Sequence, residues 1–173
     1  MATSLASLAS LSVQATLTSA LVTIGSGTAT VNKTYGTAFT QGTSAGQCDL
    51  LYFDERTLTA SSSENLDLSG TITDAFGNPV VFARIKALAI FAAATNTNNV
   101  LVGGVTNGIA GLFTSATAGI ASVRPGAFVA WGCGAADATG YVVTAATGDL
   151  LKIANSSSGT SVVYDIFVIG NSA

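Results

Sequence analysis

The side chains able to carry acid–base or nucleophilic chemistry are few in this chain. Its 173 residues include no histidine, six lysines and arginines, and nine aspartates and glutamates, so that 9% are charged. Soluble domains average about 25%. A serine or cysteine nucleophile needs a neighbouring base, and without histidine the Ser–His and Cys–His pairs are excluded. Lys33, Lys86 and Lys152 could act as bases, but none stands in an SxxK spacing.

Pairs of carboxylates could still hydrolyse glycosidic bonds, with one acid protonating the leaving group and a second acting as base or nucleophile. The candidates are Asp54, Glu55, Glu64, Asp67, Asp74, Asp137, Asp149 and Asp165. Most of them stand beside turn residues, where carboxylates commonly accept hydrogen bonds from backbone amides. This placement favours a structural role and leaves a glycosidase as the third alternative for function.

Metal and cofactor sites have little support in the sequence. Zinc would require cysteine or histidine ligands, and Cys48 and Cys133 have no CxxC spacing. We expect two free thiols, with one disulfide as the alternative. Asp49, Asp54 and Glu55 could offer oxygens to calcium, but their spacing fits no calcium loop. We therefore expect no metal, no cofactor and no catalytic residues.

Charge and hydropathy argue against two classes of partner. The net charge is −3, and the six cations are scattered, whereas nucleic-acid binding requires several phosphates to be neutralised together. The mean hydropathy is +0.55, but no uninterrupted apolar stretch approaches the roughly 20 residues of a membrane-spanning helix. The first residues also lack the basic and continuous apolar regions of a secretory signal. We expect neither a nucleic-acid nor a membrane partner.

Short apolar segments separated by Gly, Asn, Asp or Pro recur along the chain and predict an all-β fold. Their spacing, roughly every 10 residues, is typical of a two-sheet β-sandwich with a jelly-roll-like course. Residues 80–94 also fit a helical spacing, but their β-branched and aromatic side chains favour a strand. The expected strands are residues 22–24, 28–31, 49–53, 56–60, 66–68, 80–94, 100–105, 109–113, 127–131, 140–144, 150–154 and 161–169.

The N-terminal residues follow another pattern. Leu5, Leu8 and Leu11 recur every third residue among alanines and serines, and Leu17 follows. The pattern predicts an irregular or short helical arm over residues 1–21, ahead of a single β-sandwich domain over residues 22–173. Such an arm can grip a neighbouring subunit, which makes these four leucines candidate assembly contacts; the alternative is a frayed terminus.

Six segments, taken as an ordered set, resemble a known group of proteins. They are LDLSG at 66–70, DAFG at 74–77, VRPGAF at 123–128, DATGYVV at 137–143, GDLLKIAN at 148–155 and VYDIFVIG at 163–170. From about residue 35 to the end, the chain is similar to small virion structural proteins of tailed bacteriophages and prophages. The resemblance implies a non-enzymatic protein made in the host cytoplasm and carried on the outer surface of the capsid or tail, foremost a capsid decoration (cement) protein that stabilises contacts between capsomers.

The implied partners are the major capsid protein or other virion subunits, and further copies of the chain. A surface this poor in charge associates readily, and capsid lattices offer threefold positions, so we expect a homo-oligomer and favour a trimer over a dimer. A carbohydrate- or receptor-binding surface or tail protein is the second alternative. It would need an exposed aromatic cluster, for which Trp131 and Tyr141 are the candidate surface anchors.

Overall fold

A computed structural model describes residues 4–21 and 25–173 of the chain. Within these residues every regular element is a β-strand, and most strands pair antiparallel. The all-β prediction is therefore confirmed. The same residues contain no helix long and apolar enough to cross a membrane.

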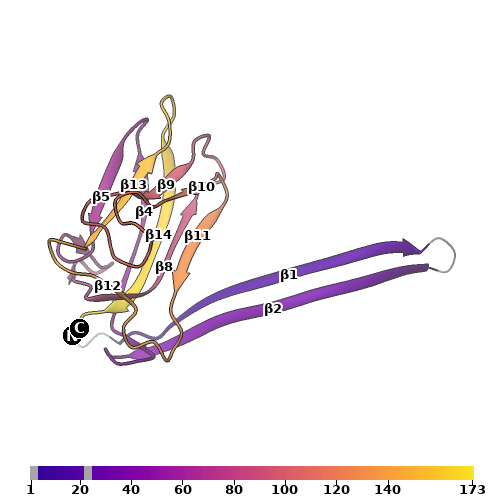
Figure 1. Cartoon of the computed structure of the whole chain (residues 1–173), viewed down its shortest axis with the longest axis horizontal. Helices are drawn as coiled ribbons and strands as arrows, with labels where there is room; N and C mark the ends of the chain where they lie inside the picture. The colour runs from indigo at the N-terminus through magenta and orange to yellow at the C-terminus, as the bar shows by residue number, and fades with distance from the viewer. Residues whose placement is uncertain (1–3, 22–24) are drawn as a thin grey trace.

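Two sheets form the body of the molecule (Figure 1). The first sheet has the order β11 (Phe128–Gly132), β8 (Arg84–Ala92), β14 (Val162–Asn171) and β4 (Leu50–Leu58), with β12 (Tyr141–Val142) also paired to β8. The second has the order β10 (Ile120–Val123), β9 (Val100–Gly103), β13 (Leu150–Asn155) and β5 (Ser63–Asp67). Two short strands, β6 (Ile72–Thr73) and β7 (Pro79–Val80), pair beside them.

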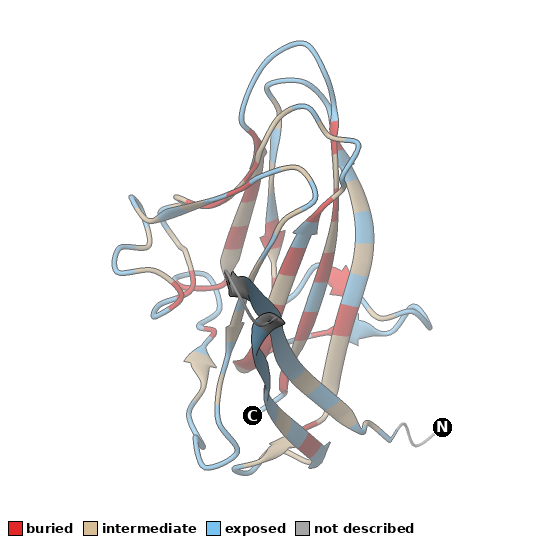
Figure 2. Cartoon of the chain, turned by 90° about the vertical axis from the view of Figure 1, so that its right-hand side faces the viewer, coloured by how far each residue is buried: buried red, intermediate tan, exposed pale blue. Residues whose placement is uncertain are grey.

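The core lies between the two sheets. Buried and exposed residues alternate along the strands, as Figure 2 shows, because successive side chains of a strand point to opposite faces. In β14, Tyr164, Ile166 and Val168 are buried and meet Leu151 and Ile153 of β13 in one cluster. Each such side chain contributes about 1.5–3 kcal/mol when fully buried. The body is thus a two-sheet β-sandwich.

The sandwich strands in the described part of the chain pair in nested order. The first, β4, pairs with the last, β14; inside this pair β5 lies against β13, β8 against β11, and β9 against β10, all antiparallel. The ladders β14–β8 and β13–β9 then join these pairs into the two sheets. The chain is thus folded back on itself, with strands of its first half paired to strands of its second half in reverse order.

A long two-stranded ribbon projects from one end of the body (Figure 1). It is formed by β1 (Ser7–Leu21) and β2 (Gly25–Gln41), paired antiparallel from Ser7↔Phe39 to Leu21↔Gly25. We call β1 and β2 together the arm. With a rise of about 3.4 Å per residue, a 15-residue strand is about 50 Å long.

The arm is fixed to the body only at its base. There β2 pairs in parallel with β3 (Gln47–Cys48), and the side chains of Phe39 and Cys48 are buried. The connection after the arm is tied to the C-terminal end, because the Asn171 amide donates a hydrogen bond to the Thr43 carbonyl at 2.9 Å. The base therefore has a defined position on the sandwich.

Several sequence predictions need correction. The segment expected to be irregular or helical is the strand β1, and the arm extends past residue 21 because β2 completes it. Residues 25–27, which separate the strands expected at 22–24 and 28–31, begin β2 opposite β1, while the strand expected at 22–24 lies outside the described residues. Residues 109–113 form turns and isolated bridges instead of a strand, whereas the strand expected within 80–94 is β8.

Candidate functional site: the arm and the phenylalanine face

The arm has two chemically different faces, because opposite residues of an antiparallel pair share a face and successive residues alternate between faces. The apolar arm face consists of Leu11, Val13, Ala15 and Leu17 of β1 and their partners Tyr35, Lys33, Val31 and Ala29 of β2. The polar arm face consists of Ser10, Ser12, Gln14, Thr16 and Thr18 and their partners Gly36, Thr34, Asn32, Thr30 and Thr28. The arm is an amphipathic ribbon.

The apolar arm face is open to solvent. Leu17 is 73% exposed, and Val31 and Tyr35 are also more than half exposed. A two-stranded hairpin alone is marginally stable in water, and this one leaves its larger side chains without a cover. Its construction favours a surface that becomes buried on contact with another molecule.

The four leucines proposed as assembly contacts do not share one face. Leu11 and Leu17 lie on the apolar arm face, while Leu8 stands opposite Ala38 at the start of the polar side. Leu5 precedes β1 and is half-buried at the base, where its backbone N–H donates a hydrogen bond to the Gln41 side chain. The structure therefore keeps two of the four leucines on the apolar arm face.

Four phenylalanines stand on the outside of the five-stranded sheet, the side turned away from the core. Phe53, Phe91, Phe128 and Phe167 come from β4, β8, β11 and β14, and each is 40–52% exposed. Phe53 and Phe167 stack with their centroids 6.4 Å apart, as do Phe91 and Phe128 at 5.4 Å. An edge-to-face contact at 6.0 Å between Phe91 and Phe167 joins the two pairs. We call these four residues the phenylalanine face.

The strand register shows how this surface is laid out. One row across the sheet is Phe53, Phe167, Ala89 and Ala130, and the next row towards the arm is Leu51, Ile169, Ala87 and Gly132. Both rows consist of apolar residues or glycine. The row on the far side is Glu55, Asp165, Phe91 and Phe128, so that two carboxylates stand at one corner of an otherwise apolar surface.

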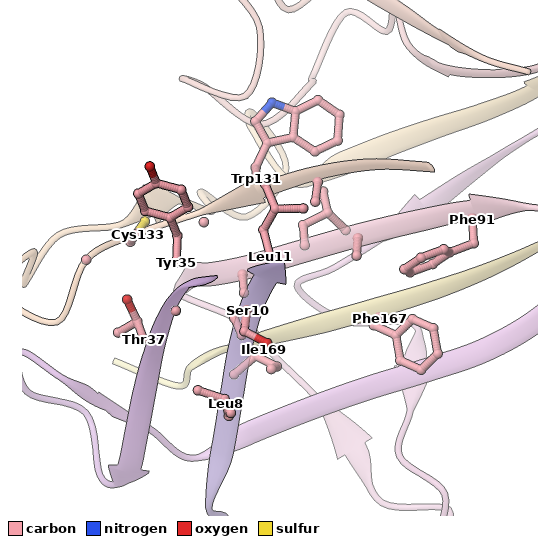
Figure 3. Close-up of a pocket in the computed structure, with 18 residues that line it drawn as sticks. Leu8, Ser10, Leu11, Tyr35, Thr37, Phe91, Trp131, Cys133, Phe167 and Ile169 are labelled. Atoms are coloured by element: carbon pink, nitrogen blue, oxygen red, sulfur yellow. The ribbon is translucent and has the colours of Figure 1, made fainter. Parts of the chain in front are cut away.

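An apolar groove of about 720 Å³ lies between the base of the arm and this sheet (Figure 3). Leu11 and Tyr35 line it from the apolar arm face, and Ala89, Phe91 and Phe167 line it from the sheet. The apolar arm face and the phenylalanine face therefore border one continuous depression.

The two aromatic residues proposed as surface anchors do not belong to the phenylalanine face, although Trp131 lines the groove beside it (Figure 3). The Trp131 ring packs edge-on against Phe113 with a centroid distance of 5.3 Å, and both Trp131 and Tyr141 are partly buried against the core. Burial raises the pKa of the Tyr141 hydroxyl. The exposed aromatic cluster is the phenylalanine face, whose residues carry no polar group with which to orient a sugar.

Two of the candidate carboxylates, Asp54 and Glu64, are held by one arginine. Arg56 donates hydrogen bonds to Glu64 Oε2 from Nε at 2.9 Å and to Asp54 Oδ2 from Nη1 at 2.8 Å. The buried Tyr164 hydroxyl donates to Glu64 Oε1 at 2.9 Å. The hydrogen bond with Glu64 holds the pKa of Arg56 above its usual range, and burial raises that of Tyr164. This network connects the two sheets and favours a structural role for Asp54 and Glu64.

The described residues contain no group of three or more Cys, Asp or Glu side chains placed to hold a metal ion. Cys48 and Cys133 are free thiols, as expected, and burial raises the pKa of Cys48 to about 11. Near them Lys86 is fully buried, and its Nζ donates to the Asp137 carbonyl at 2.5 Å. The burial of Lys86 and its bond to a backbone carbonyl favour a structural role for this lysine.

Sequence reasoning missed both the arm ribbon and the phenylalanine face. The signal for the arm was available, since Ala9, Leu11, Val13, Ala15 and Leu17 alternate with polar residues at the period of a strand. The phenylalanines stand on four strands that are distant in sequence, so only the register unites them. Comparisons with protein-family models, with curated proteins and with solved structures find no match to this chain.

Proposed function

We propose that this chain is a non-enzymatic structural protein of a tailed-bacteriophage virion, most specifically a capsid decoration protein that stabilises contacts between capsomers. The observation that carries an assembly role is the arm, a ribbon about 50 Å long by its strand geometry with one uncovered apolar face. The phage virion as its place rests on the resemblance of residues 66–70, 74–77 and 123–170. On the nested strand pairing, we assign the sandwich to the jelly-roll class.

The physical demands on a decoration protein suit this construction. It must attach at many equivalent positions, and weak identical contacts on a shell add up through multivalency. A rigid β-sandwich supplies the body, and the arm extends its reach to a neighbour. The partners that we propose are the major capsid protein or another virion subunit, together with copies of the chain, in a trimer by preference.

The test is to locate the protein on purified particles. We expect mass spectrometry and antibody labelling to find it on the outer surface in a fixed ratio to the major capsid protein. Particles stripped of it should rebind the added protein and resist heat or low salt better than before. Absence from purified virions would overturn the proposal. A glycan array and a glycosidase assay are expected to be negative, and a specific signal in either would favour the corresponding alternative.

A further inference from the structure

We infer that the apolar arm face of one copy docks on the phenylalanine face of a second copy, with Lys33 of the arm placed against Glu55 and Asp165 of the receiving sheet. This inference rests on the proposed assembly role, because it names the partner of the arm. It concerns a contact between two copies of the chain and can be tested without virus particles.

The first reason is the acidic corner beside the phenylalanine face, in the sheet row that also holds Phe91 and Phe128. Glu55 and Asp165 are directly opposite each other on β4 and β14. Like charges in directly opposed positions destabilise a sheet. Within residues 4–21 and 25–173, neither carboxylate forms an ion pair, since the only pairs are those of Arg56. The corner is therefore repulsive in the isolated chain and would be relieved by a cation from outside.

The charge of the arm is the second reason. Lys33 is the only charged residue before Asp49, and it stands opposite Val13 in the middle of the apolar arm face. Its ammonium lies 5.8 Å from the centroid of the Tyr35 ring. All nine acidic residues belong to the rest of the chain. An arm with one central cation in an apolar stretch thus matches an apolar sheet face with an acidic corner.

Size and continuity are the third reason. From Leu11 to Leu17 the apolar arm face is about 20 Å long, and four neighbouring strands with their side chains are also about 20 Å across. Of the eight residues that define the apolar arm face, Leu11 and Tyr35 line the groove, and the other arm residues that line it lie at the base: Leu8, Ala9, Ser10, Gly36 and Thr37. Beyond that point the groove is open, so that a second arm can reach the phenylalanines.

The small area of this contact also explains why the copies would need to close into a ring. An apolar patch of about 20 by 10 Å buries only a few hundred Å² per side, below the roughly 800 Å² per partner of a stable pair. A ring in which every copy gives one arm and receives another doubles the buried area for each copy. Closed rings of two or three copies are the usual result of such repeated contacts.

The experiment is a double-mutant cycle on the purified full chain, read by sedimentation velocity at several concentrations. Lys33→Glu should weaken association about tenfold or more, because it places a third negative charge at the acidic corner. Glu55→Lys should also weaken it, by removing a partner of Lys33. The double variant Lys33→Glu with Glu55→Lys should recover most of the wild-type association, since every copy then carries both halves of the reversed pair.

Lys152→Glu is the matched control, because it reverses a lysine on β13 of the other sheet, and its association should equal that of the wild type. Far-ultraviolet circular dichroism should give the same strand spectrum for every variant. Additive weakening in the double variant would overturn the inference, as would a monomeric wild-type chain at all concentrations. If the variants instead lose particle binding while self-association is unchanged, the arm docks on another virion protein and the proposed function still holds. Absence of the protein from virions would overturn the function alone.

Discussion

Removing the arm should separate association from folding. Leu8 and Ala38 are direct partners in the ribbon, so replacing residues 9–37 by Asn-Gly joins them through a two-residue hairpin turn. The variant keeps Phe39 and Cys48, which form the buried base. It loses the apolar arm face and one wall of the groove.

The expected change in the free energy of unfolding follows from the exposure of the side chains that are removed. Because Leu17 is 73% exposed and the other large side chains of the apolar arm face are also exposed, their removal costs the isolated body almost no burial. We expect the free energy of unfolding of the monomer to change by less than about 1 kcal/mol, as for surface substitutions. Ile166→Ala is the control for sensitivity: its fully buried side chain predicts a loss of about 2–5 kcal/mol.

Urea unfolding measures this difference, with the fluorescence of Trp131 as the probe, because its indole packs against Phe113 beside the core. The shortened chain should also sediment as a monomer at concentrations where the wild type associates. A loss of stability comparable to that of Ile166→Ala would refute the idea of an independent arm. Unchanged association would refute its role as the contact.

Three further predictions concern the body. Glu64→Ala should lower the free energy of unfolding by about 3 kcal/mol in urea titrations, since it leaves the buried Tyr164 hydroxyl unpaired and removes one of the two carboxylates that pair with Arg56, which keeps Asp54; Glu64→Gln should lose less. Gly103→Ala should cost about 2 kcal/mol or more by the same assay, because its φ is +103° and the added Cβ would lie 2.7 Å from the Phe113 ring. The stability provided by the neutral Cys48 thiol should be present below pH 9 and fall as the pH rises through about 11, so thermal unfolding should shift less over this range in Cys48→Ala.

The sandwich was largely predictable because its strands alternate against a core. β14 is the clearest case, with Tyr164, Ile166 and Val168 facing inward and their neighbours outward. Residues 109–113 misled the prediction because Ile109 and Leu112 are buried from turns, where Gly111 adopts a φ of +88°. The apolar side chains there are buried as in a strand, but a glycine with a positive φ turns the backbone away from an extended conformation.

The arm and the phenylalanine face were missed for a different reason. A strand that packs one face against its own core can be recognised from the sequence together with the strands it packs against. In the described part of the chain, the apolar arm face packs against the body only at its base. Three leucines at every third residue then resembled a helical pattern, although Val13 and Ala15 complete an alternation of period two. The phenylalanines were hidden because a surface cluster on four strands depends on pairing register, which no single segment of sequence contains.

The low charge of the chain takes on a specific meaning under these proposals. Surfaces that remain in water keep mixed charges for solubility, and the polar arm face meets that need with Ser, Thr, Asn and Gln instead. The apolar arm face and the three sheet rows that carry the phenylalanine face hold three charged residues between them, Lys33, Glu55 and Asp165. If they cover one another, these three charges are the ones that fix which arm meets which sheet, because charge matching contributes specificity more than affinity. The scarcity of charge is then a property of surfaces built to be buried in an assembly.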